Sequence, residues 1–474
     1  MAARDSVSGV LVEEFDMIII GSGAGLNIVD PAVNAGLKVA LVESGPLGGT
    51  CLNRGCIPSK MWIYPADIIR EIEDAGRVGV NAKVESADFD LIRRRTWDVV
   101  LRDRGHIEEA VEADPRMKLY KVQGKFVGDH TLAVGSEKIR APRIVIAAGA
   151  RSHIPSIPGL DKVPYLLSEN IFDITTLPES IIMLGGGYKS CELGHFFSAM
   201  GTKVSIVQRN VRLLPDEEPE MSFVVKKMLG RHVSISTNQS VKEVRPVPGG
   251  VEVVREDRET GAIVVEEAER LFIGTGMVSN ADLLNVSATG VGTDERGYIK
   301  VDPFLRTTAP DIWALGDITG RHMFRHTANY ESQVVWHNMN NKELAETDEH
   351  AIPHAVYTYP TVGSVGMTEE QAKAGGLKYL IGVSRYAMVA KGSAMNDDTG
   401  LVKVMVEKGT RRILGAHIVG KEADLLVQQM VYLMNAGDMS YMPMARSQII
   451  HPALNEVLIS ALGRLQDPEH EHRH

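Results

Sequence analysis

Two of the three cysteines in this 474-residue chain, Cys51 and Cys56, lie five residues apart in one short segment. On a regular helix that spacing separates the Cα atoms by about 8.7 Å, whereas a disulfide requires about 4.4–6.8 Å. A bridge between the two thiols therefore requires a break in the helix. Gly55 supplies backbone freedom for such a break, and Pro58 suits the first turn of a new helix.

The position of Cys56 indicates what such a pair would do. If a helix begins near Cys56, its dipole favours the thiolate form, which is typical of a redox-active disulfide. Two alternatives are open, namely two buried structural cysteines or half of a zinc site. No second Cys/His pair has ligand spacing, so no metal site is expected. The third cysteine, Cys191, is expected to be a small packing residue.

A candidate proton-transfer pair, His451 and Glu456, lies near the end of the chain. Histidine is the side chain that best exchanges protons near neutral pH. A nearby carboxylate would orient the ring and stabilise its protonated form. The alternative is a His-Pro turn at a helix terminus. The presence of the cysteine pair favours the catalytic interpretation.

The residues before the cysteine segment form a dinucleotide-binding pattern. Residues 15–20 and 38–43 predict two buried parallel strands with a helix between them. The turn after the first strand contains Gly21, Gly23 and Gly25. Such glycines let the backbone approach a pyrophosphate at the helix N-terminus.

Two details refine this pattern. Glu43 lies 22 residues after Gly21, close to the ~20 expected for an acid that binds a ribose hydroxyl. The third glycine position of the fingerprint holds Leu26, and glycine stands one place earlier, at Gly25. Because strand, helix and acid are all in place, the segment predicts dinucleotide binding.

A second pattern of the same kind follows, with predicted strands at residues 180–184 and 204–207. Its turn contains Gly185, Gly187 and Tyr188, and its second strand ends at Gln208 and Arg209. An NAD-binding unit would carry an acid in place of Gln208. Arg209 can bind a 2′-phosphate, or it can be a solvated arginine at a strand end; both interpretations are kept.

Residues 48–60, which include Cys-Leu-Asn-x-Gly-Cys-Ile-Pro-Ser-Lys, resemble the active-site segment of the FAD-dependent pyridine nucleotide–disulfide oxidoreductases. This form is most similar to that of dihydrolipoamide dehydrogenases, with mycothione reductases next. The resemblance implies FAD at the first dinucleotide pattern and NAD or NADP at the second. Further cofactor contacts implied by the resemblance are Gly49, Thr50, Lys60, Gly124, Ala148, Gly149, Asp317 and Gly276.

The resemblance also implies roles in catalysis. Cys51 would exchange with the substrate and Cys56 would face the flavin. Lys60 would approach the flavin with Glu192 as its counter-ion. His451 and Glu456 would come from the partner subunit of a homodimer, with His451 as the base. Lys189 is a departure from the family, which usually has an apolar residue at that place.

The implied reaction is two-electron transfer between NAD(P)(H) and a small dithiol or disulfide. Dihydrolipoamide dehydrogenase activity is the first expectation, with lipoamide free or on a carrier domain. A mycothione reductase or another NADPH-dependent reductase of small disulfides is the alternative. Mercuric reductase is disfavoured because no cysteine pair lies near the C-terminus. A flavoprotein scaffold without turnover, suggested by Lys189, is the non-enzyme alternative.

The expected fold is α/β, with two Rossmann-like domains and a C-terminal α+β dimerisation domain. The predicted boundaries are 1–155 and 275–347 for the FAD domain, 156–274 for the NAD(P) domain and 348–474 for the interface domain.

The bulk composition narrows the possible partners. A net charge of −10 argues against nucleic acids and anionic membranes as partners, and no apolar run is long enough to span a bilayer. Residues 1–14 lack an apolar signal core and cysteines are few, so a cytoplasmic protein is expected. The histidines of the tail, His470, His472 and His474, predict a disordered end rather than a metal site.

Overall fold

The computed structural model describes residues 12–468. The expectations for the extreme N-terminus and for the three tail histidines fall on residues outside this range. The chain packs as two compact units, each assembled from three segments. Among the described residues, the first unit contains 12–58, Arg94–His153 and Met277–Thr347; the second contains Ser59–Arg93, Ile154–Gly276 and 348–468.

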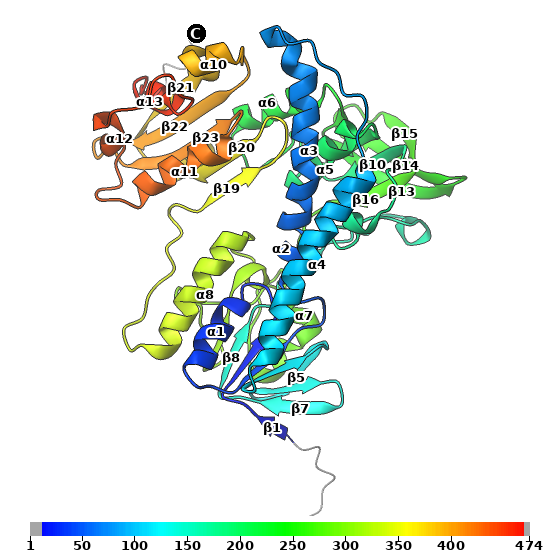
Figure 1. The fold of residues 1–474 in the computed structure, drawn as a ribbon, viewed down its shortest axis with the longest axis vertical. Coiled ribbons are helices and arrows are strands. Elements are labelled where there is room, and N and C mark those ends of the chain that lie inside the picture. The colour runs from blue at the N-terminus through cyan, green and yellow to red at the C-terminus, as the bar shows by residue number, and fades with distance from the viewer. Residues whose placement is uncertain (1–11, 469–474) are drawn as a thin grey trace, which may run out of the picture. The chain divides into compact units, whose positions relative to one another are not determined.

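The first unit is built on a five-stranded parallel sheet (Figure 1). Its strands, in spatial order, are β18 (Ile312–Ala314), β8 (Arg143–Ile146), β2 (Met17–Ile20), β3 (Val39–Val42) and β4 (Met117–Tyr120). All residues of β2 and β3 are buried, which explains their uninterrupted apolar sequences. Helices α1 (Leu26–Asn34) and α8 (Arg325–Asn340) contribute apolar residues to one of the cores at this sheet.

Smaller elements complete the first unit. They are a four-stranded sheet in the order β1 (Val12–Glu14), β7 (Glu137–Arg140), β6 (Thr131–Val134) and β5 (Gly124–Gly128), and the antiparallel pair β9 (Ala150–Ser152) and β17 (Met277–Ser279). Helix α4 (Phe89–Ala113) is rich in charged residues, and α7 (Ala281–Leu284) follows β17.

The second unit contains a second parallel sheet. Its order is β12 (Ser234–Ser236), β11 (Lys203–Val207), β10 (Ser180–Leu184) and β16 (Arg270–Ile273). Helix α5 (Tyr188–Ala199) follows β10, and α6 (Pro219–Leu229) lies between β11 and β12 in the chain. A three-stranded antiparallel sheet, β13 (Gln239–Val247), β14 (Gly250–Asp257) and β15 (Ile263–Ala268), packs against it through a shared apolar core.

The C-terminal part of the second unit is a five-stranded antiparallel sheet. Its order is β19 (Pro353–Val356), β20 (Val362–Gly366), β23 (Ile413–Val419), β22 (Leu401–Glu407) and β21 (Tyr379–Arg385). Helices α11 (Ala423–Met434) and α13 (Glu456–Leu462) pack on this sheet (Figure 1). Shorter helices are α9 (Glu369–Ala374), α10 (Ala390–Ala394) and α12 (Met442–Arg446).

These sheets confirm the predicted fold class, two Rossmann-like sheets and a C-terminal α+β region. The four-segment domain boundaries stay a prediction. Within residues 12–468, no helix combines the length and apolar character needed to cross a bilayer.

Candidate functional site

The cysteine segment folds as two helices with a break between them. Helix α2 spans Gly49–Arg54 and α3 spans Cys56–Asp74. A Cβ atom at Gly55 would lie 3.0 Å from the carbonyl oxygen of Thr50 and 3.3 Å from the Cα of Cys51. The chain therefore turns back on α2 at Gly55, as the sequence predicts, and Cys56 is the first residue of a new helix. Cys51 is half-buried and Cys56 is exposed.

Asn53 fixes the position of α2. Its buried side-chain amide donates hydrogen bonds to the carbonyl oxygens of Leu47 at 2.8 Å and Gly49 at 2.9 Å. Its Oδ1 accepts two hydrogen bonds from the guanidinium of Arg104, at 2.9 and 2.7 Å. Arg104 lies on α4, so this helix supports the cysteine segment. The sequence contains no local signal for this contact.

The first glycine-rich turn lies directly beside this segment. A Cβ at Gly21, where φ is +101°, would meet the carbonyl oxygen of Ala147 at 2.3 Å, so only glycine fits. A Cβ at Gly25 would meet the carbonyl oxygen of Gly21 at 2.4 Å. Gly25 therefore makes the close packing contact that the third glycine of the fingerprint usually makes. Leu26, which stands at that third position, begins α1. A Cβ at Gly49 would lie 2.6 Å from the Cα of Gly23.

Glu43 is held at the end of β3 by the same turn. Its Oε2 accepts hydrogen bonds from the backbone N–H of Ser22 at 2.9 Å and from the Ser22 hydroxyl at 2.7 Å. Its Oε1 accepts one from the N–H of Gly45 at 2.7 Å. A carboxylate has about four acceptor positions, so capacity remains for a ligand hydroxyl. Ser22 is a partner that the motif analysis missed.

Three other residues predicted to bind FAD lie at the carboxyl ends of the same parallel strands. Asp317 follows β18, and Ala148 and Gly149 follow β8. Asn280 donates to the carbonyl oxygen of Ala148 at 2.8 Å, and the Cβ direction at Gly149 is open. Gly124 packs at the end of β3, where a Cβ would lie 3.0 Å from Val42.

This edge of the sheet fits FAD. It offers a glycine-rich turn at the N-terminus of α1 for a pyrophosphate, and carboxylates at two strand ends for sugar hydroxyls. A crevice at the carboxyl ends of parallel strands is where open α/β sheets bind dinucleotides.

The second glycine-rich turn is built in the same way. A Cβ at Gly185, where φ is +99°, would meet the carbonyl oxygen of Gly274 at 2.3 Å, whereas the Cβ direction at Gly187 is open. Gly276, predicted as a cofactor contact, follows two residues after Gly274 and also has an open Cβ direction. Tyr188, the first residue of α5, is 48% exposed. The turn fits the pyrophosphate of a nicotinamide dinucleotide for the same physical reason as the first.

Gln208 is buried and its amide group faces the protein. Its Oε1 accepts hydrogen bonds from the N–H of Gly186 at 3.1 Å and of Arg209 at 3.0 Å, and its Nε2 donates to the carbonyl oxygen of Arg212 at 3.3 Å. Arg209 is exposed. At this strand end a neutral side chain therefore replaces the acid of an NAD-binding unit, and Arg209 is accessible to a ligand.

Lys60 is held by Glu192, as predicted. Its Nζ lies 2.7 Å from Oε2 of Glu192, whose side chain is only 6% exposed. The Glu192 Oε1 accepts a hydrogen bond from the N–H of Tyr357 at 2.9 Å, and the Tyr357 ring centroid is 4.3 Å from the Lys60 ammonium. Tyr357, which the sequence analysis did not single out, therefore completes the site that orients Lys60.

Helices α3 and α5, which carry Lys60 and Glu192, are also joined further along α3. His195 of α5 lies 2.8 Å from Asp67, and Arg70 donates to the Ser198 hydroxyl at 2.8 Å. The indole of Trp62 is buried and packs against several aromatic rings, Phe89, Phe172, Phe196 and Phe197. The helix that begins at Cys56 is therefore rigidly attached to α5.

His451 and Glu456 form the predicted pair. The ring Nδ1 lies 2.8 Å from Oε1 of Glu456, and Oε2 accepts a hydrogen bond from the N–H of Ala453 at 3.0 Å. The hydrogen bonds from His451 and Ala453 lower the pKa of Glu456. A carboxylate at Nδ1 leaves Nε2 as the basic nitrogen, and the His451 side chain is 70% exposed. The imidazole can therefore exchange protons with a molecule that contacts this surface.

Cys191 is buried, and burial raises the pKa of its thiol. It is therefore a packing residue, as expected.

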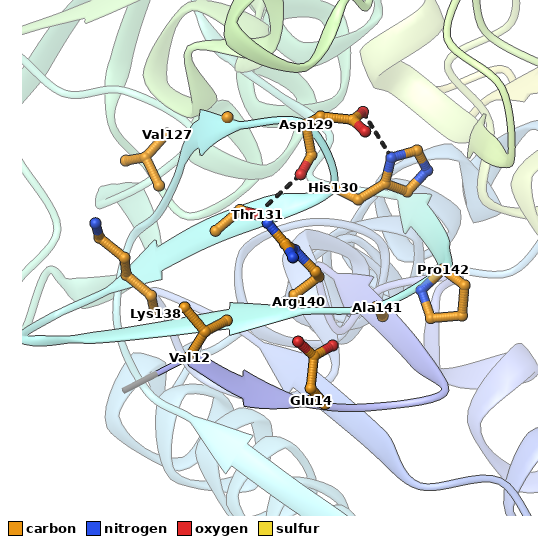
Figure 2. A pocket seen from close by; sticks show the side chains of 11 residues that line it. Val12, Glu14, Val127, Asp129, His130, Thr131, Lys138, Arg140, Ala141 and Pro142 are labelled. Atoms are coloured by element: carbon orange, nitrogen blue, oxygen red, sulfur yellow. Dashed lines mark hydrogen bonds and ion pairs between the residues drawn. The ribbon is translucent and has the colours of Figure 1, made fainter. Parts of the chain in front are cut away.

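A separate hollow lies on the four-stranded sheet of the first unit, where Glu14, His130, Lys138 and Arg140 are among its lining residues (Figure 2). It lies where the chain enters β2 and β8, whereas the glycine-rich turn is at their carboxyl ends, so it is not the dinucleotide site.

Two family models match the chain. Residues 15–332 match the pyridine nucleotide-disulphide oxidoreductase model, and residues 352–462 match the dimerisation domain of the same family. Mycothione reductase of Mycobacterium tuberculosis is 35% identical over 470 residues, which are 95% of this chain and 99% of the relative. Dihydrolipoyl dehydrogenase of Chlorobaculum parvum is 32% identical over 88% of this chain and 90% of the relative.

A mercuric reductase of Bacillus cereus is 32% identical over 86% of this chain and 65% of the relative. Among solved structures, the HOCl-induced flavoprotein disulfide reductase RclA of Escherichia coli is similar to this chain with a TM-score of 0.83. That pair is 28% identical, and the match covers 94% of this chain and 99% of RclA.

Proposed function

Because this chain belongs to the pyridine nucleotide-disulphide oxidoreductases, we propose that Cys51 and Cys56 reduce a low-molecular-weight disulfide at the expense of NADPH. The family is FAD-dependent and uses NAD(P)H, and flavin-dependent disulfide oxidoreductase activity is its chemistry. The observation that carries the proposal is the helix break at Gly55, which turns the chain back toward Cys51 and starts a helix at Cys56.

The thiol chemistry needs two exchanges. The Cys51 thiolate attacks one sulfur of the substrate disulfide, forming a mixed disulfide and releasing the first thiolate, which takes a proton from His451. The Cys56 thiolate, favoured by the N-terminus of α3, then attacks the Cys51 sulfur. The second substrate thiolate leaves and takes a proton from solvent, and a Cys51–Cys56 disulfide remains. When bound, FAD would supply the two-electron chemistry that returns this disulfide to the dithiol, with NADPH as the source of the electrons.

Several residues of this chain would support these steps. Glu456 keeps Nε2 of His451 as the basic nitrogen, since its carboxylate lies at Nδ1. Lys60, held by Glu192 and Tyr357, places a positive charge one helical turn after Cys56. The residues at the carboxyl edge of the first sheet would hold FAD. Gly187 and Arg209 would contact the nicotinamide cofactor, and Gln208 would hold the turn in place.

The substrate class is proposed from two observations. The similarity to a mycothione reductase extends over nearly the whole of both chains, and the neutral Gln208 beside the exposed Arg209 favours NADPH over NADH. Dihydrolipoamide dehydrogenase activity is the second candidate. It is favoured by the form of the Cys51–Lys60 segment and by the 32% identical dihydrolipoyl dehydrogenase.

We further propose that the chain acts as a homodimer in the cytoplasm. The dimerisation-domain match supports the homodimer, and the low cysteine content supports a reducing compartment. The exposed His451 would then serve the cysteines of the partner subunit.

A substrate panel tests the proposal. NADPH and NADH are each assayed with the disulfides of mycothiol and glutathione and with lipoamide, and the reverse reaction is assayed with dihydrolipoamide and NAD⁺. We expect turnover with NADPH and a small thiol disulfide. Faster turnover of dihydrolipoamide with NAD⁺ would establish the second candidate. Absence of flavin bleaching by either nucleotide under anaerobic conditions would establish a scaffold instead of an enzyme.

A further inference from the structure

Four polar residues form a continuous row across the C-terminal sheet. His354 on β19 pairs directly with Ser364 on β20, Ser364 pairs with His417 on β23, and His417 pairs with Lys403 on β22. Directly paired residues point to the same face of a sheet. Ser364, His417 and Lys403 are each at most 2% exposed, so the row crosses a buried surface. We call these four residues the polar row.

The polar row binds two adjacent buried carboxylates that precede α6. Glu217 accepts a hydrogen bond from the Ser364 hydroxyl at 2.6 Å and lies 2.6 Å from Nε2 of His354. Glu218 lies 3.1 Å from Nζ of Lys403 and accepts a hydrogen bond from the N–H of Glu369. Glu217 and Glu218 are 5% and 0% exposed.

Lys403 is the centre of this arrangement. Besides Glu218, its ammonium lies 2.8 Å from Glu220 and 2.7 Å from Glu369. Burial lowers the pKa of Lys403, but the carboxylates outweigh this and raise it overall. These three carboxylates could otherwise surround a metal ion, yet the ammonium already provides the cation.

Such a buried ionic cluster holds its members in one arrangement, because a displaced charge would lose its partners without gaining water. The two carboxylates end the segment that begins at Gln208. At the start of the segment, Gln208 accepts a hydrogen bond from the backbone N–H of Gly186. Further along, the N–H of Leu214 donates a hydrogen bond to the carbonyl oxygen of Gly186 at 2.9 Å. The segment 208–218 is thus attached to the second glycine-rich turn at one side and to the polar row at the other.

We propose that the polar row positions the segment 208–218 for the adenosine end of NADPH, which makes Lys403 and Ser364 positioning residues for cofactor selection. The inference rests on the proposed binding of NAD(P)H at the second glycine-rich turn. Loss of the cluster would let the segment shift, so Arg209 would lose its fixed place beside the 2′-phosphate. NADPH binding would suffer more than NADH binding, because only NADPH carries that phosphate.

The test uses the full-length FAD-loaded protein. Binding of NADP⁺, NAD⁺ and adenosine 2′,5′-bisphosphate is measured by calorimetry for the wild type, Lys403→Met and Ser364→Ala. Ser384→Ala is the matched control, because Ser384 is also buried in this sheet but its hydroxyl donates to Ser460 at 2.8 Å, away from the carboxylates. Flavin content and Tm are recorded for every variant.

We expect Lys403→Met to weaken NADP⁺ and adenosine 2′,5′-bisphosphate binding about tenfold or more, and Ser364→Ala about fivefold, both within the usual range of coupling between sites. NAD⁺ binding should change less, and Ser384→Ala should change none of them. Should Lys403→Met not fold, Ser364→Ala decides. The inference is overturned if a folded Ser364→Ala or Lys403→Met variant keeps the wild-type affinity for NADP⁺ and the wild-type ratio of NADP⁺ affinity to NAD⁺ affinity. A wild type that binds neither nucleotide would instead refute the proposed function.

Discussion

Gln208 accepts a hydrogen bond from the backbone N–H of Gly186 at 3.1 Å, and this contact repeats, with an amide, the one that Glu43 makes with Ser22 at 2.9 Å in the first motif. Both side chains stand just after the second strand of a βαβ unit and hold the residue after the first glycine of the turn. The two motifs therefore differ at this place in charge and not in geometry. A carboxylate repels a 2′-phosphate, whereas an amide does not.

Gln208→Glu should reduce the preference for NADPH. A glutamate can accept the same hydrogen bonds from the N–H groups of Gly186 and Arg209, and it loses only the one that Nε2 of Gln208 donates to the carbonyl oxygen of Arg212. It also adds a negative charge near the 2′-phosphate. We expect the ratio of kcat/KM for NADPH to that for NADH to fall at least about tenfold, which corresponds to 1.4 kcal/mol. Adding Arg209→Ala should lower the ratio further. A wild type that favours NADH by more than about tenfold would show that Arg209 points to solvent.

The two cysteines should differ in their effect on the flavin spectrum. If Cys56 faces the flavin, Cys51→Ser leaves a Cys56 thiolate that gives a long-wavelength charge-transfer band. Cys56→Ser should abolish the band after two-electron reduction. The absorbance of both variants is recorded under anaerobic conditions. A band that survives in Cys56→Ser would reverse the assigned order of the two thiols.

Local parts of the site could be predicted from the sequence because they depend on neighbouring residues. Gly55 and Pro58 predicted the helix break, and the strand-turn-helix pattern predicted both glycine-rich turns. The polar row could not be predicted in this way. Its residues belong to four strands, and which residues face one another depends on strand register, which neighbouring sequence does not determine. The partners of Gln208 were missed for a similar reason, since the motif suggests a ligand contact and not a bond to the turn.

His354 should stabilise the protein more at low pH than at high pH. Burial lowers the pKa of His354, but the hydrogen bond and charge of Glu217, with Asp216, outweigh it and raise the pKa above its ordinary value of 6.5. A raised folded-state pKa gives stabilisation that is complete below 6.5 and is lost as the pH rises through the folded-state value. His417 also lies in this cluster, and burial lowers its pKa.

The Tm of the wild type and of His354→Asn is compared at about pH 6 and about pH 9. The Tm difference should be larger at the lower pH. His350→Asn is a positive control outside the polar row. Burial lowers the pKa of His350, but the Asp348 hydrogen bond and the Met434 carbonyl raise it overall, so this Tm difference should also be larger at the lower pH. A Tm difference for His354→Asn that grows with pH would contradict the assigned ion pair.

His451→Gln should slow the disulfide half-reaction selectively. Without the imidazole, the leaving thiolate has no positioned proton donor, so we expect a loss of roughly 10²–10⁴ in rate. Flavin reduction by NADPH involves no step at His451 and should be nearly unchanged. The two half-reactions are measured separately by stopped flow. An equal loss of rate in both half-reactions would show that His451 is structural. Glu456→Gln should give a smaller loss of rate in the disulfide half-reaction.

The subunit origin of His451 can be tested by mixing two inactive variants. Cys51→Ser lacks the attacking thiol and His451→Gln lacks the base, so each homodimer is inactive. If the base acts across the dimer, a hybrid dimer contains one site with the intact cysteines of one chain and the partner subunit's His451. Random exchange of subunits makes half of the dimers hybrids with one intact site, so roughly a quarter of the wild-type rate should return. If His451 serves the cysteines of its own chain, every site in a hybrid lacks one group and no activity returns.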